Sequence, residues 1–394
     1  MTDMPASEVE NVPESKAKNL DSAAHHPRIT GTRILIISTI LLAANWLVLA
    51  TWNYFLGTQA RLWQIIPPAL TLTFVATTFL SLRYSNFWLR WAYRASVIWL
   101  GVLNFGFFAA CAAWIFSAAT VWLPFHLHQQ LIGVTFFGMA LLVSIYGLVN
   151  ANWVRITRVT VKLPHLPMEW RGRNVALVTD LHLGNVRGRG YSRSIVAKLQ
   201  RLQPDAVFIS GDLFDGTKAK LEAFVAPWKE FSAPEGIYYV TGNHEEFTDR
   251  TKFIKAVTSA GIRVLHNEKV EVRGLQIAGV FDGEAQDPQL FRALLQQMEL
   301  DRNRASLLLA HQPSNLAIPE EEGISLQLSG HTHGGQVWPW TRMASRVHGR
   351  FNRGLNRFGK LLVFTSMGAG TWGVPMRVGT RSEIVLLRLE STDF

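Results

Sequence analysis

One long stretch of the chain contains no acidic residue. Between Ser22 and Met168 of the 394-residue sequence there is neither Asp nor Glu, and Leu, Ile, Phe, Ala and Trp are abundant. Such a stretch folds either into an unusually large core or within a lipid bilayer. The remaining sequence has an ordinary globular composition, so the chain divides into two parts of different character.

Four apolar runs occupy this stretch, and none has a charged residue in its interior. They are Ile34–Leu56, Leu62–Leu82, Ala95–Leu123 and Gln130–Asn150. Each is close to or above the ~20 residues with which a helix crosses a bilayer. A single buried core helix has the same composition, but four runs in succession with short links favour membrane spans. We therefore predict a bundle of four transmembrane helices over residues 33–150, after a disordered polar tail over residues 1–32.

Basic residues flank the runs unevenly, and this predicts an orientation. Arg28 and Arg33 precede the first run. Arg83, Arg90 and Arg94 lie between the second and third runs, and Arg155, Arg158 and Lys162 follow the fourth. The other two loops hold only Arg61. Both termini and the C-terminal part are therefore expected on the cytoplasmic side of the inner (cell) membrane.

Charge and cysteine content add two limits. The net charge of +10 suits nucleic acid, anionic lipid or phosphorylated substrates and does not choose among them. A fixed membrane anchor makes nucleic acid an unexpected partner. Cys111 is the only cysteine, so the chain forms no intramolecular disulfide.

After a connector over residues 151–171, the pattern changes to short apolar strands alternating with helical segments. One expected helix is Lys218–Phe231. Expected strands include Ala206–Ser210, Ser306–Ala310 and Ile324–Leu328, preceded by a connecting strand near Val159–Leu163. Plainer strands follow toward the C-terminus. This succession predicts that residues 172–394 form an α/β domain with a layered β-sandwich core flanked by helices.

Five of the expected strands end in residues that bind metals. They are followed by Asp180 and His182, by Asp212, by Asn243 and His244, by His311, and by His331 and His333. Sites in α/β sheets form at the carboxyl ends of strands, so these side chains can converge on one rim. Carboxylate, imidazole and amide ligands without thiolates suit divalent Mn, Fe, Zn or similar ions. Even without His244 the ligands are too many for one ion with an open position, and they suit two ions bridged by a carboxylate.

The pair His331 and His333 has a plainer alternative. If the preceding strand continues through them, residues two apart share a face and both rings point the same way. Taken alone, the pair is equally compatible with a polar loop, and only the other strand ends favour a metal site.

The ordered blocks DxH, GDxxD, GNHE, a lone His and GHTH resemble those of the calcineurin-like binuclear metallophosphoesterases, over about residues 172–390. The last block, GHTHGGQ, is similar to that of a membrane-linked branch of the family. The resemblance implies a first ion held by Asp180, His182 and His333, a second held by Asn243, His311 and His331, and a bridge made by Asp212. It also implies that His244 acts beside the leaving group, as general acid or charge stabiliser, and that Asp215 orients it.

The resemblance implies a membrane-anchored hydrolase of phosphodiesterase or pyrophosphatase type that uses two metal ions. Its phosphate-ester substrate is expected to be lipid-linked or nucleotide-linked, with manganese among the candidate ions. Arg353 and Arg377 are candidate substrate contacts. The alternative is a phospholigand-binding or signalling module without turnover.

Basic residues crowd the segment after the GHTH block, with two tryptophans among them. They are Trp338, Trp340, Arg342, Arg346, Arg350, Arg353, Arg357 and Lys360. Three interpretations stay open: a grip on a phosphate group, contact with an anionic membrane leaflet, or a solvated basic loop.

Overall fold

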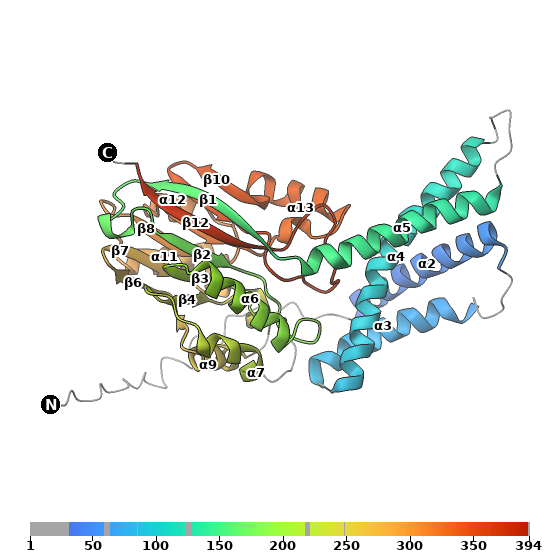
Figure 1. The fold of residues 1–394 in the computed structure, drawn as a ribbon, viewed down its shortest axis with the longest axis horizontal. Coiled ribbons are helices and arrows are strands. Elements are labelled where there is room, and N and C mark those ends of the chain that lie inside the picture. The colour runs from blue at the N-terminus through green and yellow to red at the C-terminus, as the bar shows by residue number, and fades with distance from the viewer. Residues whose placement is uncertain are drawn as a thin grey trace.

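A helical region and a globular domain lie end to end in the computed structural model (Figure 1). The structure describes residues 31–58, 64–84, 86–120, 122, 128–216, 221–247 and 249–392. Most of the predicted N-terminal tail lies outside the described residues. The helical region consists of α2 (Gly31–Leu56), α3 (Ile66–Arg83), α4 (Phe87–Thr120) and α5 (Gln129–Asn152).

By length and composition, three of the described helices can cross a membrane, namely α2, α4 and α5. Three of the four predicted membrane spans therefore correspond to helices of sufficient length and apolar composition. The second run forms α3, whose described apolar part, Ile66–Ser81, is shorter. Two prolines stand at the start of α3, where the first helical turn leaves backbone N–H groups unpaired in any case.

Polar side chains join the apolar helices to one another. Asn45 of α2 donates a hydrogen bond to Thr71 of α3 at 3.2 Å and accepts one from the Trp99 indole of α4 at 2.9 Å. Thr77 of α3 and Ser96 of α4 lie 3.0 Å apart at their hydroxyl oxygens. Bonds of this kind between apolar helices stabilise a bundle where the surrounding solvent offers no polar partner.

Two six-stranded sheets form the centre of the globular domain. The first has the order β1 (Arg155–Leu163), β12 (Glu383–Ser391), β2 (Asn174–Val178), β3 (Ala206–Ser210), β4 (Ile237–Val240) and β5 (Arg263–Val264). The second has the order β10 (Gly354–Phe358), β11 (Leu361–Thr365), β9 (Leu326–Ser329), β8 (Ser306–Leu309), β7 (Leu275–Gly279) and β6 (Glu268–Val272). Strands β2 to β5 are parallel, and so are β7, β8, β9 and β11.

The sheets face each other across an apolar core that includes Leu177, Phe208, Ile277, Leu307 and Phe364. A second core packs the first sheet against α6 (Arg189–Leu202), α7 (Leu221–Val225) and α9 (Arg250–Thr258). A third packs the second sheet against α11 (Pro288–Gln297) and α12 (Ala317–Glu321). Shorter elements are α8 (Asn243–Glu246), α10 (Asp282–Gln286), α13 (Trp340–His348) and the 3-10 helices η2 (Met168–Trp170), η3 (Ala226–Glu230), η4 (His333–Gly335) and η5 (Gly349–Asn352). The predicted layered α/β domain is confirmed.

Two local features differ from the sequence prediction. The helix expected over Lys218–Phe231 is, in its described part, α7 followed by η3, because Pro227 has no N–H to continue the helical bonding. The basic segment after the GHTH block contains α13, η5 and β10, none of which was predicted. The connecting strand expected near Val159–Leu163 is part of β1, which begins earlier, at Arg155, and pairs with β12 along its whole length.

Candidate metal centre

Strands from both sheets deliver their C-terminal ends to one rim. Asp180 follows β2, Asp212 follows β3 and Asn243 begins α8 just after β4, all in the first sheet. From the second sheet, His311 follows β8 and His331 follows β9. The Ser210 hydroxyl donates to the Leu328 carbonyl at 2.8 Å and ties the two sheets together there. The convergence predicted from the strand ends is therefore present.

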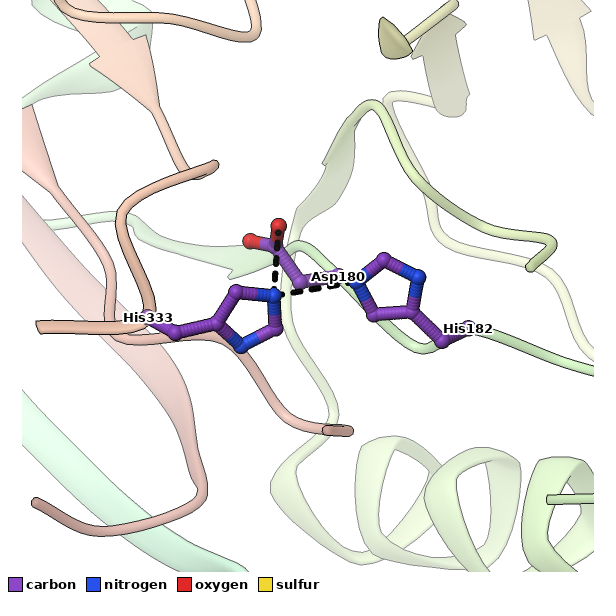
Figure 2. Close-up of side chains that lie close together, drawn as sticks. All are labelled: Asp180, His182 and His333. Carbon is purple, nitrogen blue, oxygen red and sulfur yellow. Dashed lines mark hydrogen bonds and ion pairs between the residues drawn. The ribbon is translucent and has the colours of Figure 1, made fainter. Parts of the chain in front are cut away.

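The first group of side chains consists of Asp180, His182 and His333, all buried (Figure 2). The Nε2 atoms of His182 and His333 lie 3.0 Å apart. His333 Nε2 lies 3.5 Å from Asp180 Oδ1. All three ligand atoms fall within 4.8 Å of one another, which is the spacing of donors around a single ion.

The second group is built around Asp212, His311 and His331, whose ligand atoms also lie within 4.8 Å of one another. Asp212 Oδ2 lies 3.2 Å from His311 Nε2, and His331 Nδ1 lies 2.9 Å from Asn243 Oδ1. The same Asp212 oxygen is 3.8 Å from His182 Nε2 of the first group. Asp212 therefore lies between the two groups.

His331 and His333 do not share a strand face, contrary to the expectation from alternation. Strand β9 ends at Ser329, and both histidines have positive φ angles, 69° and 49°. The backbone turn directs His333 to the first group and His331 to the second. Strand alternation does not apply beyond the last paired residue.

Backbone strain is concentrated at this rim. Asp180, His182 and Asp212 also have positive φ angles, 54°, 48° and 50°. This conformation costs a non-glycine residue on the order of 1–3 kcal/mol and persists only where the surroundings enforce it. Neighbouring glycines make room for the turns: a Cβ atom on Gly330 would lie 2.3 Å from Asp180 Oδ2, and one on Gly242 would lie 2.2 Å from Asp212 Oδ1.

The donor set fits divalent metal ions. His311 Nδ1 donates to the Ser210 carbonyl at 2.8 Å, which leaves Nε2 directed at the centre. That Nε2 is buried and, among the described residues, has no hydrogen-bond partner. A ring nitrogen fixed in this way is typical of a metal ligand whose other nitrogen is held by a carbonyl group. Nitrogen and oxygen donors together suit Mn, Fe or Zn.

Burial and neighbouring charges set the protonation of the centre. Burial lowers the pKa of His331 to about 3, and the charge of His311 adds to the effect. Burial also holds the pKa values of His182 and His333 well below the ordinary value, so these rings are neutral, as metal ligation requires. Burial raises the pKa of the Asp212 carboxyl, but the charge and hydrogen bond of His311, together with the charges of His244 and His182, outweigh this and hold it well below its usual range.

His244 forms a third group with His182 and Asp212, whose ligand atoms lie within 4.8 Å of one another, and it is 7% exposed. Its Nδ1 donates to the backbone carbonyl of Asp215 at 3.1 Å, and its backbone N–H donates to Asp212 Oδ1 at 3.0 Å. The aromatic rings of Phe247 and Trp372 lie 4.8 and 6.1 Å from the His244 ring. Residue 215 thus contacts His244 through its backbone oxygen, while the Asp215 carboxylate accepts from the Asn185 N–H at 3.1 Å.

Glu245, the last residue of the GNHE block, holds two backbone segments of the rim. Its buried carboxylate accepts from the backbone N–H groups of Gly242, Asp212 and Phe214 at 2.7, 3.0 and 2.8 Å. It therefore caps α8 and also fixes the loop that carries Asp212. The GNHE block contained this residue, but no sequence spacing indicates which loop its side chain reaches.

The two arginines proposed as substrate contacts have different surroundings. Arg353 is exposed just before β10. Arg377 is fully buried, and its guanidinium donates to the carbonyl oxygens of Gly370 and His333 at 2.7 and 3.2 Å. Arg377 therefore lies behind the first group and supports His333 from the protein side.

A separate cavity of ≈ 650 Å³ lies elsewhere, lined by residues such as Gln289, Arg292, Leu316 and Phe358. Arg292 is its only charged lining residue and is paired with Glu321. With no cluster of catalytic side chains, this cavity is not a candidate active site.

Residues 173–335 match the family model of the calcineurin-like phosphoesterases. An uncharacterised metallophosphoesterase of Helicobacter pylori is 32% identical over 218 residues, which are 55% of this chain and 59% of that protein. A transmembrane protein with metallophosphoesterase domain from Danio rerio is 34% identical over 266 residues, which are 63% of this chain and 60% of the Danio rerio protein. The chain spans about three fifths of the length of these two relatives.

A third relative is covered almost completely. An uncharacterised metallophosphoesterase of Aquifex aeolicus is 28% identical over 261 residues, which are 64% of this chain and 98% of that protein. The family match begins just before β2 and ends just after the His331 and His333 turn, so it contains both groups of the rim. Over residues 173–335 the chain is therefore similar to the calcineurin-like phosphoesterases.

Proposed function

We propose that this protein is a membrane-anchored, metal-dependent phosphohydrolase. The observation that carries the proposal is the meeting of two histidine-and-carboxylate groups at Asp212, inside a calcineurin-like domain. A binding module without turnover would have no need of the buried His244 at the edge of both groups. That histidine favours catalysis over binding alone.

In this proposal Asp180, His182 and His333 hold one ion, and Asn243, His311 and His331 hold the other, with Asp212 shared. When bound, such ions offset the charge of the phosphoryl oxygens and make water more acidic. The Ser210 carbonyl keeps the proton of His311 on Nδ1, so its Nε2 stays available as a ligand. Manganese is one candidate ion, along with iron and zinc.

His244 is proposed to act at the leaving group. Its Nδ1 proton is held by the Asp215 carbonyl, so Nε2 is the atom free to share a proton with the departing oxygen. Phe247 and Trp372 limit the access of water around the ring. An alcohol or phosphate with a high pKa leaves poorly unless it receives such a proton.

We further propose that α2, α3, α4 and α5 all span the inner membrane, with both termini and the catalytic domain in the cytoplasm. The basic loops support this orientation. The substrate is proposed to be a lipid-linked or nucleotide-linked diester or pyrophosphate, because an anchored enzyme meets membrane substrates most readily. Arg377 is not proposed as a substrate contact, because its donors are used within the protein.

The test is a screen of the full chain, purified in lipid nanodiscs, against mono-, di- and pyrophosphate esters with added Mn²⁺. Hydrolysis is expected, and Asp212→Asn should lower it by at least about a hundredfold because a shared ligand loses its charge. Asp301→Asn, an exposed carboxylate away from the rim, is the matched control and should keep full activity. Ligand binding without turnover in the wild type would instead support the signalling module.

A further inference from the structure

Large apolar side chains are exposed on one part of the globular domain more than elsewhere. Those exposed between residues 151 and 392 are Trp153, Met168, Phe247, Trp338, Trp340, Met343, Leu355, Val347 and Trp372. Four of them fall in the ten residues from Trp338 to Val347. This short segment contains α13, which Figure 1 shows at the end of the domain that faces the helical region.

The apolar residues of α13 form a stripe along one side of the helix. Trp340, Met343 and Val347 are spaced by three and four residues, so they share a face. Their exposed fractions are 55%, 58% and 69%. Thr341, Ala344 and His348, on the neighbouring face, are half-buried against the domain. The helix is thus attached by one face and leaves an apolar stripe uncovered.

The stripe continues into the helical region. The Trp340 indole donates to Asn104 Oδ1 of α4 at 3.1 Å, and Asn104 Nδ2 donates to the Trp338 carbonyl at 3.2 Å. The rings of Trp338 and Phe108 lie 5.2 Å apart. Since α4 is one of the helices apolar enough to cross a membrane, α13 lies directly beside lipid-facing surface.

The charged side chains around the stripe are all basic. Arg342, Arg346 and Arg350 are all exposed. The sequence from residue 323 to residue 382 contains no Asp or Glu. An amphipathic helix with arginines beside an apolar stripe is suited to the boundary between anionic headgroups and acyl chains.

We propose that α13 docks into the surface of the anionic membrane leaflet, with Trp340, Met343 and Val347 below the headgroups and Arg342 and Arg346 at the lipid phosphates. This inference rests on the membrane anchoring in the proposed function. It has a consequence for the metal centre, because the His348 ring of α13 lies 6.2 Å from the ring of His331. The docked helix places that side of the rim beside the lipid headgroups.

The test measures the depth of three positions in the full chain. Cys111→Ala removes the only cysteine, and Val347→Cys, Met168→Cys and Leu142→Cys are then made singly and labelled with an environment-sensitive fluorophore. Val347, Met168 and Leu142 are 69%, 76% and 68% exposed, so the labels start from comparable accessibility. Each protein is reconstituted into phosphatidylcholine vesicles with or without phosphatidylglycerol, and lipids with a nitroxide high in the acyl chain serve as quencher.

The label at 347 is expected to be quenched like the one at 142, in the middle of α5, while the label at 168 stays in water. A label at 347 that behaves like the one at 168, while 142 is quenched, overturns the inference and leaves the anchoring intact. Loss of quenching at 142 as well overturns the anchoring and the inference together. Fluorescence quenching is measured without turnover. A protein that does not hydrolyse esters is therefore distinguished from one whose α13 does not dock.

The charge component is tested by Arg342→Gln combined with Arg346→Gln in the Val347→Cys protein. Near an anionic surface each arginine changes the docked-to-undocked ratio by about a factor of five, so quenching should fall in vesicles with phosphatidylglycerol. Equal quenching in both lipid mixtures, before and after the change, contradicts the lipid phosphate contacts. A label that stays in water in these vesicles but is shielded in native membranes assigns the stripe to a protein partner instead.

Discussion

Asp212 lies where the two groups meet, and both of its carboxylate oxygens have close neighbours. One of its oxygens accepts the His244 backbone N–H at 3.0 Å, and the other lies near His182 and His311 at 3.8 and 3.2 Å. A buried carboxylate is stable only when opposite charges or hydrogen bonds surround it. Without ions, the charge of His311 fulfils that need, and a bound cation would fulfil it more completely.

Adding metal should therefore stabilise the protein as well as activate it. With Mn²⁺ at a hundred times its dissociation constant, the chelator-treated chain is expected to gain about 2.7 kcal/mol in free energy of unfolding. Thermal unfolding followed by tryptophan fluorescence measures the gain. Asp212→Asn should show little of it, and an equal gain in that variant would remove Asp212 from the metal site.

His244 lends itself to a separate prediction, since it is proposed to act without holding metal. His244→Ala should retain its metal content but lose about 10²–10⁴-fold in kcat on esters with poor leaving groups, because no proton donor remains. Activated aryl esters should be affected far less. Rates measured across a series of leaving-group pKa values, with metal content determined alongside, check this, and a uniform loss over the series would argue against proton transfer.

At the scale of elements, the segment between β11 and β12 joins the helical region to the rim. Met376 packs with Phe105 of α4 and Val337, and its backbone neighbour Arg377 donates its N–H to the Gly147 carbonyl of α5 at 3.0 Å. Asn150 of α5 donates to the carbonyls of Arg377 and Thr380 at 2.8 and 2.9 Å. Through the Arg377 guanidinium, α5 is thus connected to His333.

Asn150→Ala should weaken this connection. Two buried carbonyl groups lose their donor, which costs about 1–3 kcal/mol in free energy of unfolding. The affinity for Mn²⁺ should fall too, because the support of His333 is loosened. Val149→Ala, whose side chain is 61% exposed on the same helix, is the control and should change stability by no more than about 0.5 kcal/mol. Equal effects of the two substitutions would show that the contact does not reach the metal site.

The sequence was informative about elements where one pattern dominated. Strands such as β3 and β8 are buried on both faces, so they appear as uninterrupted apolar runs and were located closely. The candidate ligands could be proposed from the sequence because each residue follows such a strand. The stripe of α13 was missed because alternating arginines made the segment resemble a loop. The contacts of Arg377 and Glu245 depend on how distant loops meet, which no local spacing encodes.

For the whole molecule, the basic loops predict which side of the membrane holds the metal centre. A fluorescent or phosphatase reporter fused after Phe394 should give a cytoplasmic signal, because arginines flank the ends of the helices that lie on that side. Blocking of single introduced cysteines by an impermeant reagent gives an independent measurement. A periplasmic signal would reverse the orientation and place the catalytic domain outside the cytoplasm.

The bond network from Asn150 through Arg377 to His333 has a practical consequence for how this protein is handled. If α5 spans the membrane as proposed, His333 would share any tilt that the helix adopts when the surrounding bilayer becomes thinner or thicker. Acyl-chain length would then be an experimental variable beside the ion and the ester, and the globular domain without its helices would be expected to bind metal differently from the full chain.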